Sequence, residues 1–233
     1  MNDPLDIALT DYIQGNPVED IIITSDLAED DIMEVAYYFR NEHDLPPLEK
    51  IALQACKGKV LDVGACVGAH TLPLIEKGFD VTAIDTSKVA MDYLHSKGVK
   101  THHAPFLEYT GGAYDTLLLL MNGIGLAGKL EELPRFLTHC YNLLREGGKV
   151  ICDSTDVSYF YEDDEGAKWI DLNAAYFGEF SFRMEYKGNV GEWFNWVYLD
   201  QELLIKQAEA IGFSVNVLFN DEETAMFLLE LTK

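Results

Sequence analysis

Two glycines and one aspartate are the first groups in this chain whose spacing could bind a ligand. Residues 60–70 read VLDVGACVGAH, so an apolar run ends at Gly64, and Gly68 precedes a helical pattern. A strand, a glycine turn and a helix start expose backbone N–H groups to a ligand. Asp85 ends the next apolar run, and a carboxylate there can accept hydrogen bonds from a ribose diol. This arrangement predicts a site for an adenosine-containing ligand.

Dinucleotide cofactors are one group of ligands that contain adenosine. Their sites favour the sequence G-x-G-x-x-G, because the backbone must approach a pyrophosphate closely. In this chain Cys66 occupies the place of the middle glycine, and no P-loop GK[ST] sequence is present. A phosphate-centred ligand is therefore disfavoured, although a nucleotide-dependent oxidoreductase stays open as an alternative.

The elements that must position these residues alternate between strand and helix patterns. Strand patterns recur at 59–63, 79–84, 99–103, 114–121 and 148–153. Helix patterns lie between them at 69–77, 88–96 and 130–144. The last third of the chain adds a hairpin at 180–186 and 193–199, a helix at 201–211, and strands at 213–219 and 225–231. The alternation predicts an α/β domain over residues 59–233, with a mostly parallel sheet covered by helices on both faces.

Residues 1–58 precede this alternation and are predicted to form a helical cap on the same structural unit. Leu5, Leu9 and Ile13 recur at helical spacing. A second helix is predicted within 27–40 and a third at 48–55. We expect the cap to contribute to the site, because a segment of this size has no evident core of its own.

The net charge of −23 is distributed unevenly along the chain. Residues 1–49 carry thirteen Asp or Glu against one Arg, residues 50–153 carry eleven acids and eleven bases, and residues 154–233 carry sixteen acids and five bases. We therefore expect no nucleic-acid partner, since clustered Lys and Arg bind phosphate backbones. The four scattered cysteines predict neither a metal site nor a disulfide framework. With no membrane-spanning apolar stretch and no leader pattern, we expect no membrane association and a cytoplasmic location.

Three segments taken together resemble a known family. They are Leu61-Asp62-Val63-Gly64, Asp85 after the second strand, and Met121-Asn122-Gly123 after the fourth. In this combination the chain resembles the class I S-adenosylmethionine-dependent methyltransferases of small-molecule type. The resemblance covers about 48–153, and the last helix and strand pair fit the family's last elements. The family's first motif is usually E/D-x-G-x-G-x-G, in which Cys66 here replaces the central glycine.

The resemblance implies a Rossmann-like three-layer sandwich: a mostly parallel seven-stranded sheet with an antiparallel C-terminal strand pair, the helical cap and an added β-hairpin. S-adenosylmethionine would be the cofactor and S-adenosylhomocysteine its product. The sulfonium methyl group would move to a nucleophilic atom of a small-molecule acceptor, mainly through positioning and desolvation. A non-catalytic module that only binds S-adenosylmethionine stays open as a second alternative.

The resemblance also implies which residues contact the cofactor. The glycine turn would approach the methionine moiety, Asp62 its ammonium group, Asp85 the ribose and Thr86 the adenine. Arg40 is the only base in an acidic segment, so we expect it to pair with the cofactor carboxylate, with a surface ion pair to Glu42 or Asp44 as the alternative. The expected cofactor-binding set is Arg40, Asp62, Gly64, Ala65, Gly68, His70, Asp85, Thr86, Phe106, Met121, Asn122 and Gly123.

Acceptor-binding residues are expected from the cap and from the late hairpin, because both can reach the carboxyl ends of the parallel strands. The expected set is Tyr37, Arg183, Tyr186, Trp193 and Trp196. Such a density of rings favours an apolar or aromatic acceptor, or a cation held against ring faces. A general base is needed only if the nucleophile carries a proton of high pKa. His103 and Asp153 are the candidates by topology, although neither has a spacing partner.

Overall fold

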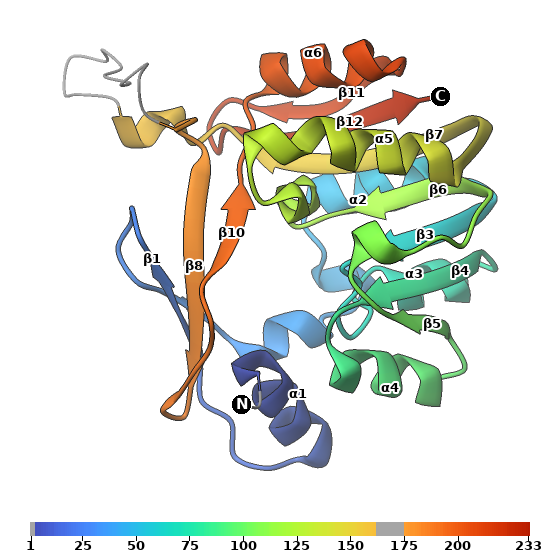
Figure 1. The fold of residues 1–233 in the computed structure, drawn as a ribbon. Coiled ribbons are helices and arrows are strands. Elements are labelled where there is room, and N and C mark those ends of the chain that lie inside the picture. Colours follow the sequence, from blue (N-terminus) through green and yellow to red (C-terminus); the bar gives the residue numbers. More distant parts are fainter. Residues whose placement is uncertain (1–2, 162–174) are drawn as a thin grey trace.

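The computed structural model describes residues 3–161 and 175–233, and it contains two sheets (Figure 1). The larger sheet has seven strands in the order β11-β12-β7-β6-β3-β4-β5. Its strands are β3 (Lys59–Val63), β4 (Asp80–Asp85), β5 (Lys100–His103), β6 (Tyr114–Leu119), β7 (Leu144–Thr155), β11 (Ser214–Asp221) and β12 (Met226–Thr232). The first five run parallel, whereas β12 is antiparallel to both β7 and β11. The predicted mostly parallel seven-stranded sheet with an antiparallel C-terminal pair is confirmed.

Helices cover both faces of this sheet, because its central strands are apolar on both sides. In β6, Leu117 and Leu119 belong to one core cluster, with α5 (Leu133–Leu143) and α6 (Gln201–Ile211). Leu118 belongs to a second cluster, with α2 (Pro47–Ala55) and α3 (Thr71–Glu76). A third cluster joins α4 (Lys88–Ser96) to α1 (Pro4–Gln14) through Leu94 and Leu9. The result is a three-layer α/β sandwich.

The smaller sheet is antiparallel and stands beyond the carboxyl ends of the parallel strands (Figure 1). It consists of β1 (Ile21–Ser25), β2 (Asp31–Met33), β8 (Glu179–Tyr186), β9 (Asn189–Val190) and β10 (Phe194–Val197). Strand β8 pairs with β10, which confirms the predicted hairpin, and on its other edge it pairs with β1. Two stretches that are far apart in the sequence, 21–33 and 179–197, thus meet in one sheet, which we call the second sheet.

The prediction of a helix within 27–40 is wrong. Residues 31–33 form β2, and 35–39 and 42–44 form short 3₁₀ helices. The β-branched run Ile21-Ile22-Ile23-Thr24 forms β1, and its partner strand β8 comes from a distant part of the chain. Tertiary pairing therefore overrides a helical spacing in which Ile32 is in fact 66% exposed. Within 3–58 the α-helices are α1 and α2.

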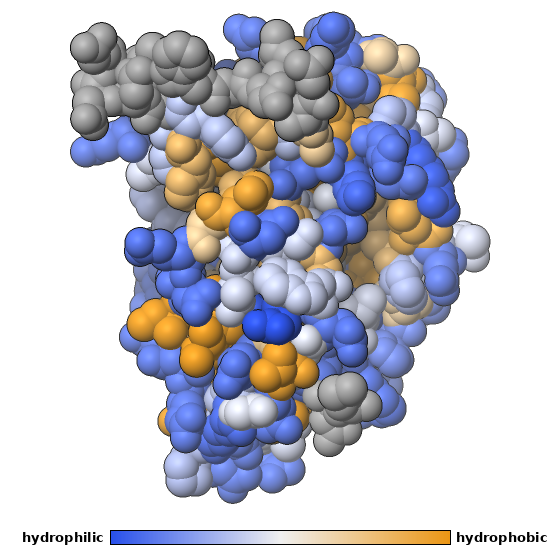
Figure 2. Space-filling model, turned by 60° about the vertical axis from the view of Figure 1, so that its left-hand side comes forward, coloured by the Kyte–Doolittle hydropathy of each residue, from blue (hydrophilic) through white to orange (hydrophobic). Residues whose placement is uncertain are grey.

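The surface of the second sheet carries apolar patches separated by hydrophilic side chains (Figure 2). Exposed apolar side chains there include Leu27, Ile32, Trp193 and Phe194. None of the helices in the part of the chain that the structure describes is long and apolar enough to cross a membrane.

Candidate active site

A cavity of about 870 Å³ lies between the carboxyl ends of the parallel strands and the second sheet. One side is lined by the turns after β3, β4 and β6, and the other by residues of β1, β2, β8 and β10. In open α/β sheets ligands bind at the carboxyl ends of the strands. The volume is at the upper end of the range for small-molecule sites, so the cavity can hold more than one small molecule.

The glycine turn after β3 is held tightly against its neighbours. Gly64 has a φ of 72° and Gly68 a φ of 92°, both in the left-handed region that favours glycine. A Cβ at Gly68 would lie 2.6 Å from Leu94 of α4. The N–H groups of Gly64 and Ala65 donate to the carbonyl of Ile84, at 2.9 and 3.2 Å. The turn is thereby tied to β4.

Cys66, at the place of the motif's central glycine, also has a positive φ, of 44°. Its Cβ makes that conformation costly, and the surrounding turn has to hold it. The thiol lines the cavity, and burial followed by the nearby Asp85 carboxylate raises its pKa. The thiol therefore stays protonated and presents a small, weakly polar surface to a ligand.

Asp85 connects the end of β4 to the glycine turn. One carboxyl oxygen accepts a hydrogen bond from Cys66 N–H and the other from Ser87 N–H, both at 2.8 Å. Burial raises its pKa, although these backbone donors act in the opposite direction. Asp62 lies deeper, where its carboxylate accepts from the Thr71 hydroxyl at 2.6 Å and burial again raises its pKa. Both carboxyl groups line the cavity.

Arg40 belongs to a buried charge network on the same side. Its Nη2 donates to both carboxyl oxygens of Glu49 at 2.6 Å, and Nη1 donates to the Tyr37 carbonyl at 3.1 Å. His70 Nε2 donates to Glu49 at 2.6 Å. Burial alone would raise the pKa of Glu49, but the hydrogen bonds from His70 and Arg40 outweigh it and the pKa is lowered. The alternative of a surface ion pair with Glu42 or Asp44 is wrong, because Arg40 is buried against Glu49.

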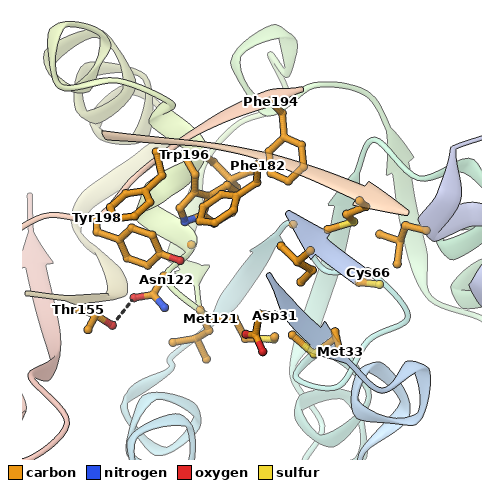
Figure 3. A pocket seen from close by; sticks show the side chains of 18 of the residues that line it. Asp31, Met33, Cys66, Met121, Asn122, Thr155, Phe182, Phe194, Trp196 and Tyr198 are labelled. Atoms are coloured by element: carbon orange, nitrogen blue, oxygen red, sulfur yellow. Dashed lines mark hydrogen bonds between the residues drawn. The ribbon is translucent and has the colours of Figure 1, made fainter. Parts of the chain in front are cut away.

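The turn after β6 has two consecutive left-handed residues, Met121 and Asn122, with φ of 62° and 57°. The Thr155 hydroxyl donates to the Asn122 side-chain oxygen at 2.8 Å, so the amide nitrogen is left for the cavity (Figure 3). Gly123 N–H donates to the Asp153 carboxylate at 3.4 Å. Burial raises the pKa of Asp153 to about 6. Asp153 lies beneath the turn and supports it, outside the cavity lining.

Aromatic side chains from the second sheet and the residue after it form the opposite side of the cavity (Figure 3). The rings of Phe180 and Phe182 lie parallel at 5.7 Å, and Tyr198 meets their edges at 5.4 and 6.3 Å. Phe194 connects Phe182 to Trp196, with centroids at 6.1 and 6.5 Å. We call these five residues the aromatic wall.

Most of the predicted cofactor residues line this cavity, and one predicted acceptor residue, Trp196, lines it with them. The cofactor residues that do so are Arg40, Asp62, Gly64, Ala65, His70, Asp85, Met121, Asn122 and Gly123. Gly68 lies behind the turn against α4, and the Thr86 carbonyl is hydrogen-bonded to exposed His103. Phe106 is in the core, with ring centroids 5.2 Å from Phe136 and 4.9 Å from His139.

The other predicted acceptor and catalytic residues are not in the lining. Tyr37 lies in a separate shallow pocket. Tyr186 is buried and donates its hydroxyl to Asp11. Arg183 packs over the Trp193 ring at 4.9 Å, on the outer face of β8. Both candidate bases, His103 and Asp153, are likewise absent from the lining.

Sequence reasoning missed the residues that form the aromatic wall, apart from Trp196. The signal was the alternation in 180–186, where Phe180, Phe182 and Met184 share one face and Arg183 lies on the other. The sequence did not indicate which face turns inward. Glu49 was also missed, because one acid among thirteen in an acidic segment carries no distinguishing pattern.

Comparisons with known proteins agree with this geometry. Residues 60–148 match a family model described as a methyltransferase domain. A cypemycin N-terminal methyltransferase from Streptomyces is 30% identical over 106 residues. The match covers 43% of this chain and 43% of that relative, so this chain spans less than half of the relative's length.

Solved structures extend the likeness to the whole chain. A methyltransferase from Bacteroides fragilis, in complex with S-adenosyl-L-homocysteine, is 34% identical and aligns with a TM-score of 0.90 over 99% of this chain and 94% of its own. A sugar N-methyltransferase from Streptoalloteichus shares the fold alone, at 15% identity and a TM-score of 0.55 over 89% and 96% of the two chains. The chain belongs to the S-adenosylmethionine-dependent methyltransferases.

Proposed function

We propose that this chain transfers the sulfonium methyl group of S-adenosylmethionine to a small-molecule acceptor. The observation that carries the proposal is the shared cavity, in which the glycine turn, Asp85 and Asn122 face the aromatic wall. A methyl donor held on one side would meet an acceptor held on the other. Membership of the methyltransferases favours this function over a nucleotide-dependent oxidoreductase.

The cofactor side offers groups that match the donor's chemistry. Asp85, at the end of the second parallel strand, would accept the ribose hydroxyls, and the Gly64 turn would take the methionine moiety. Asp62 supplies a carboxyl group for the ammonium. Arg40 supplies a buried cation whose Nε has no hydrogen-bond partner among the described residues, and a cofactor carboxylate would provide that partner. The remaining contacts go to cavity-lining residues, namely Ala65, His70, Met121, Asn122 and Gly123. Gly68, Thr86 and Phe106 lie outside the lining and are not assigned a contact.

Methyl transfer from a sulfonium is an in-line displacement, so alignment and exclusion of water supply much of the acceleration. The nucleophile's lone pair forms the new bond to the methyl carbon while the carbon–sulfur electron pair moves onto sulfur. The transition state spreads an existing positive charge, which apolar surroundings favour. A wall of rings on the acceptor side suits this requirement without a dedicated catalytic base.

The test begins with cofactor binding. Replacing Asp85 by Ala should weaken S-adenosylhomocysteine binding about tenfold or more in calorimetric titration, because hydrogen bonds to a charged group contribute about 1.5–3 kcal/mol. Asp80→Ala at the other end of β4 is the matched control, since Asp80 pairs with Lys100 at the surface and should leave binding unchanged. The protein is then incubated with S-adenosylmethionine and a mixture of small-molecule acceptors. Mass spectrometry should detect S-adenosylhomocysteine and a methylated product. Tight binding without turnover across such mixtures would instead support a non-catalytic binding module.

A further inference from the structure

The half of the cavity under the second sheet has no positively charged side chain among the described residues. The basic side chains of the described lining are Arg40 and His70, and both are bound to Glu49 on the cofactor side. Three consecutive acids line the cavity instead, namely Glu29 and Asp30 from the loop before β2 and Asp31, the first residue of β2. Within residues 3–161 and 175–233, no ion pair neutralises any of the three. An anionic acceptor would meet like charge there.

The aromatic wall is a second feature that favours a positively charged acceptor. Ring faces carry negative electrostatic potential, and a cation within about 6 Å of a ring centroid is attracted by about 0.5–2 kcal/mol. Tyr198 and Asp31 line the same cavity. Burial raises the pKa of Tyr198 to about 12, with Tyr159 and Asp31 contributing, so its hydroxyl stays neutral. The hydroxyl end of Tyr198 points toward the side of the cavity where Asn122 lies (Figure 3). Rings therefore share the acceptor half with the Asp31 carboxylate, which accepts a hydrogen bond from Ile32 N–H at 2.8 Å and has no ion-pair partner among the described residues.

We propose, building on the function proposed above, that the acceptor is an amine that binds as its ammonium form between the aromatic wall and Asp31 and is methylated on nitrogen. Before transfer the ammonium loses one proton, through the exposed Asp31 carboxylate to solvent. The freed nitrogen lone pair then forms a bond to the methyl carbon, and the carbon–sulfur electron pair returns to sulfur. The products are a methylated ammonium and neutral S-adenosylhomocysteine, so one proton is released for each methyl transferred.

A phenol or carboxylate acceptor fits this surface less well. Either must be an anion to be a strong nucleophile, and the acids at Glu29 to Asp31 disfavour an anion and raise the pKa of a phenol. An amine is a nucleophile while neutral, and both its entering and its product forms are cations. The overall charge of −23 also favours the encounter with cations over anions.

The experiment compares two probes of the same shape, choline and 3,3-dimethylbutanol, which differ in a quaternary nitrogen against a quaternary carbon. Their dissociation constants are measured by NMR titration of the full chain saturated with S-adenosylhomocysteine. Choline should bind about tenfold more tightly, as expected for a cation against several rings and a carboxylate. Asp31→Asn should weaken choline about threefold or more and leave the alcohol unchanged. Asp20→Asn, an acid outside the cavity lining, should alter neither.

The outcome that overturns the proposal is equal binding of the two probes, or no binding of choline, while S-adenosylhomocysteine still binds. Turnover provides a second measurement: phenethylamine and related amines should yield N-methylated product, and 2-phenylethanol and phenylacetate should not. Methylation of the alcohol or the acid in preference to the amine also refutes the amine assignment but leaves methyl transfer intact. Failure of S-adenosylhomocysteine itself to bind would refute the proposed function instead.

Discussion

Replacing Glu49 tests how much the buried network of Arg40, Glu49 and His70 contributes to the free energy of unfolding. The side chains of Arg40 and Glu49 are only 5% and 6% exposed, and His70 completes the network at 8%. Glu49→Ala leaves a guanidinium buried with no anion beside it. Loss of one partner of a buried pair costs about 3–5 kcal/mol, so we expect the free energy of unfolding to fall by that amount.

A surface pair of the same length provides the control. Lys77 and Glu42 also lie 2.6 Å apart, but their side chains are 37% and 41% exposed, and such pairs contribute about 0–1 kcal/mol. Urea denaturation of Glu49→Ala, Glu42→Ala and the unaltered chain measures both losses. Equal losses for the two variants would refute the reasoning, because the distance is matched whereas burial and the number of partners differ.

The same network predicts how stability depends on pH. Hydrogen bonds lower the pKa of Glu49 in the folded chain below its ordinary value of 4.5, so its stabilising contribution is present above pH 4.5. That contribution disappears as the pH falls further through the folded-state value. Glu49→Gln removes the titration, and its free energy of unfolding should therefore decline less than that of the unaltered chain between pH 4.5 and 3. If the free energy of unfolding declines equally with pH in Glu49→Gln and in the unaltered chain, Glu49 is not the group whose protonation destabilises the fold.

Two further predictions concern the turn after β6 and the aromatic wall. Burial raises the pKa of Asp153 from 3.8 to about 6, so the folded state holds its proton more tightly, and stability should fall by about 2 kcal/mol as the pH rises from 4 to 6. Asp153→Asn should remove that decline in urea denaturation, and an unchanged slope would contradict the assignment. Gly125→Ala would place a Cβ 2.1 Å from the Trp196 indole nitrogen and should weaken choline binding about threefold or more, with S-adenosylhomocysteine binding unchanged. Gly112→Ala, with no atom within 4 Å, is its control, and equal effects would exclude displacement of the indole.

The main sheet could be predicted from the sequence because its signals are local. The apolar run 116–120 and the left-handed Gly212 that ends α6 each mark an element without reference to distant residues. Strand β1 has a β-branched run, but no local signal shows that its partner is the distant strand β8, and β2 joins the sheet only through β1. The local spacing in 27–40 therefore predicts a helix where the structure has β2 and a short 3₁₀ helix.

The candidate site divides in the same way. The glycine turn and Asp85 follow strands directly, so their place at the sheet edge could be predicted from the sequence. Arg183 and Phe182 are neighbours in β8 and point to opposite faces. The packing of the second sheet against the larger sheet decides which of the two faces the cavity. A shift of one residue exchanges the two faces of a strand, and no residue in the hairpin specifies that choice alone.

The two halves of the cavity are encoded in separate stretches of the chain. The methyl-donor half follows the parallel strands, whereas the second sheet is assembled from 21–33 and 179–197, which lie outside the seven-stranded sheet. Substitutions in those stretches can reshape the wall without altering the hydrogen bonds that hold the glycine turn to β4. Related enzymes can therefore diverge in acceptor choice while inheriting one unchanged cofactor cradle, and the second sheet is the part to redesign when a new acceptor is wanted.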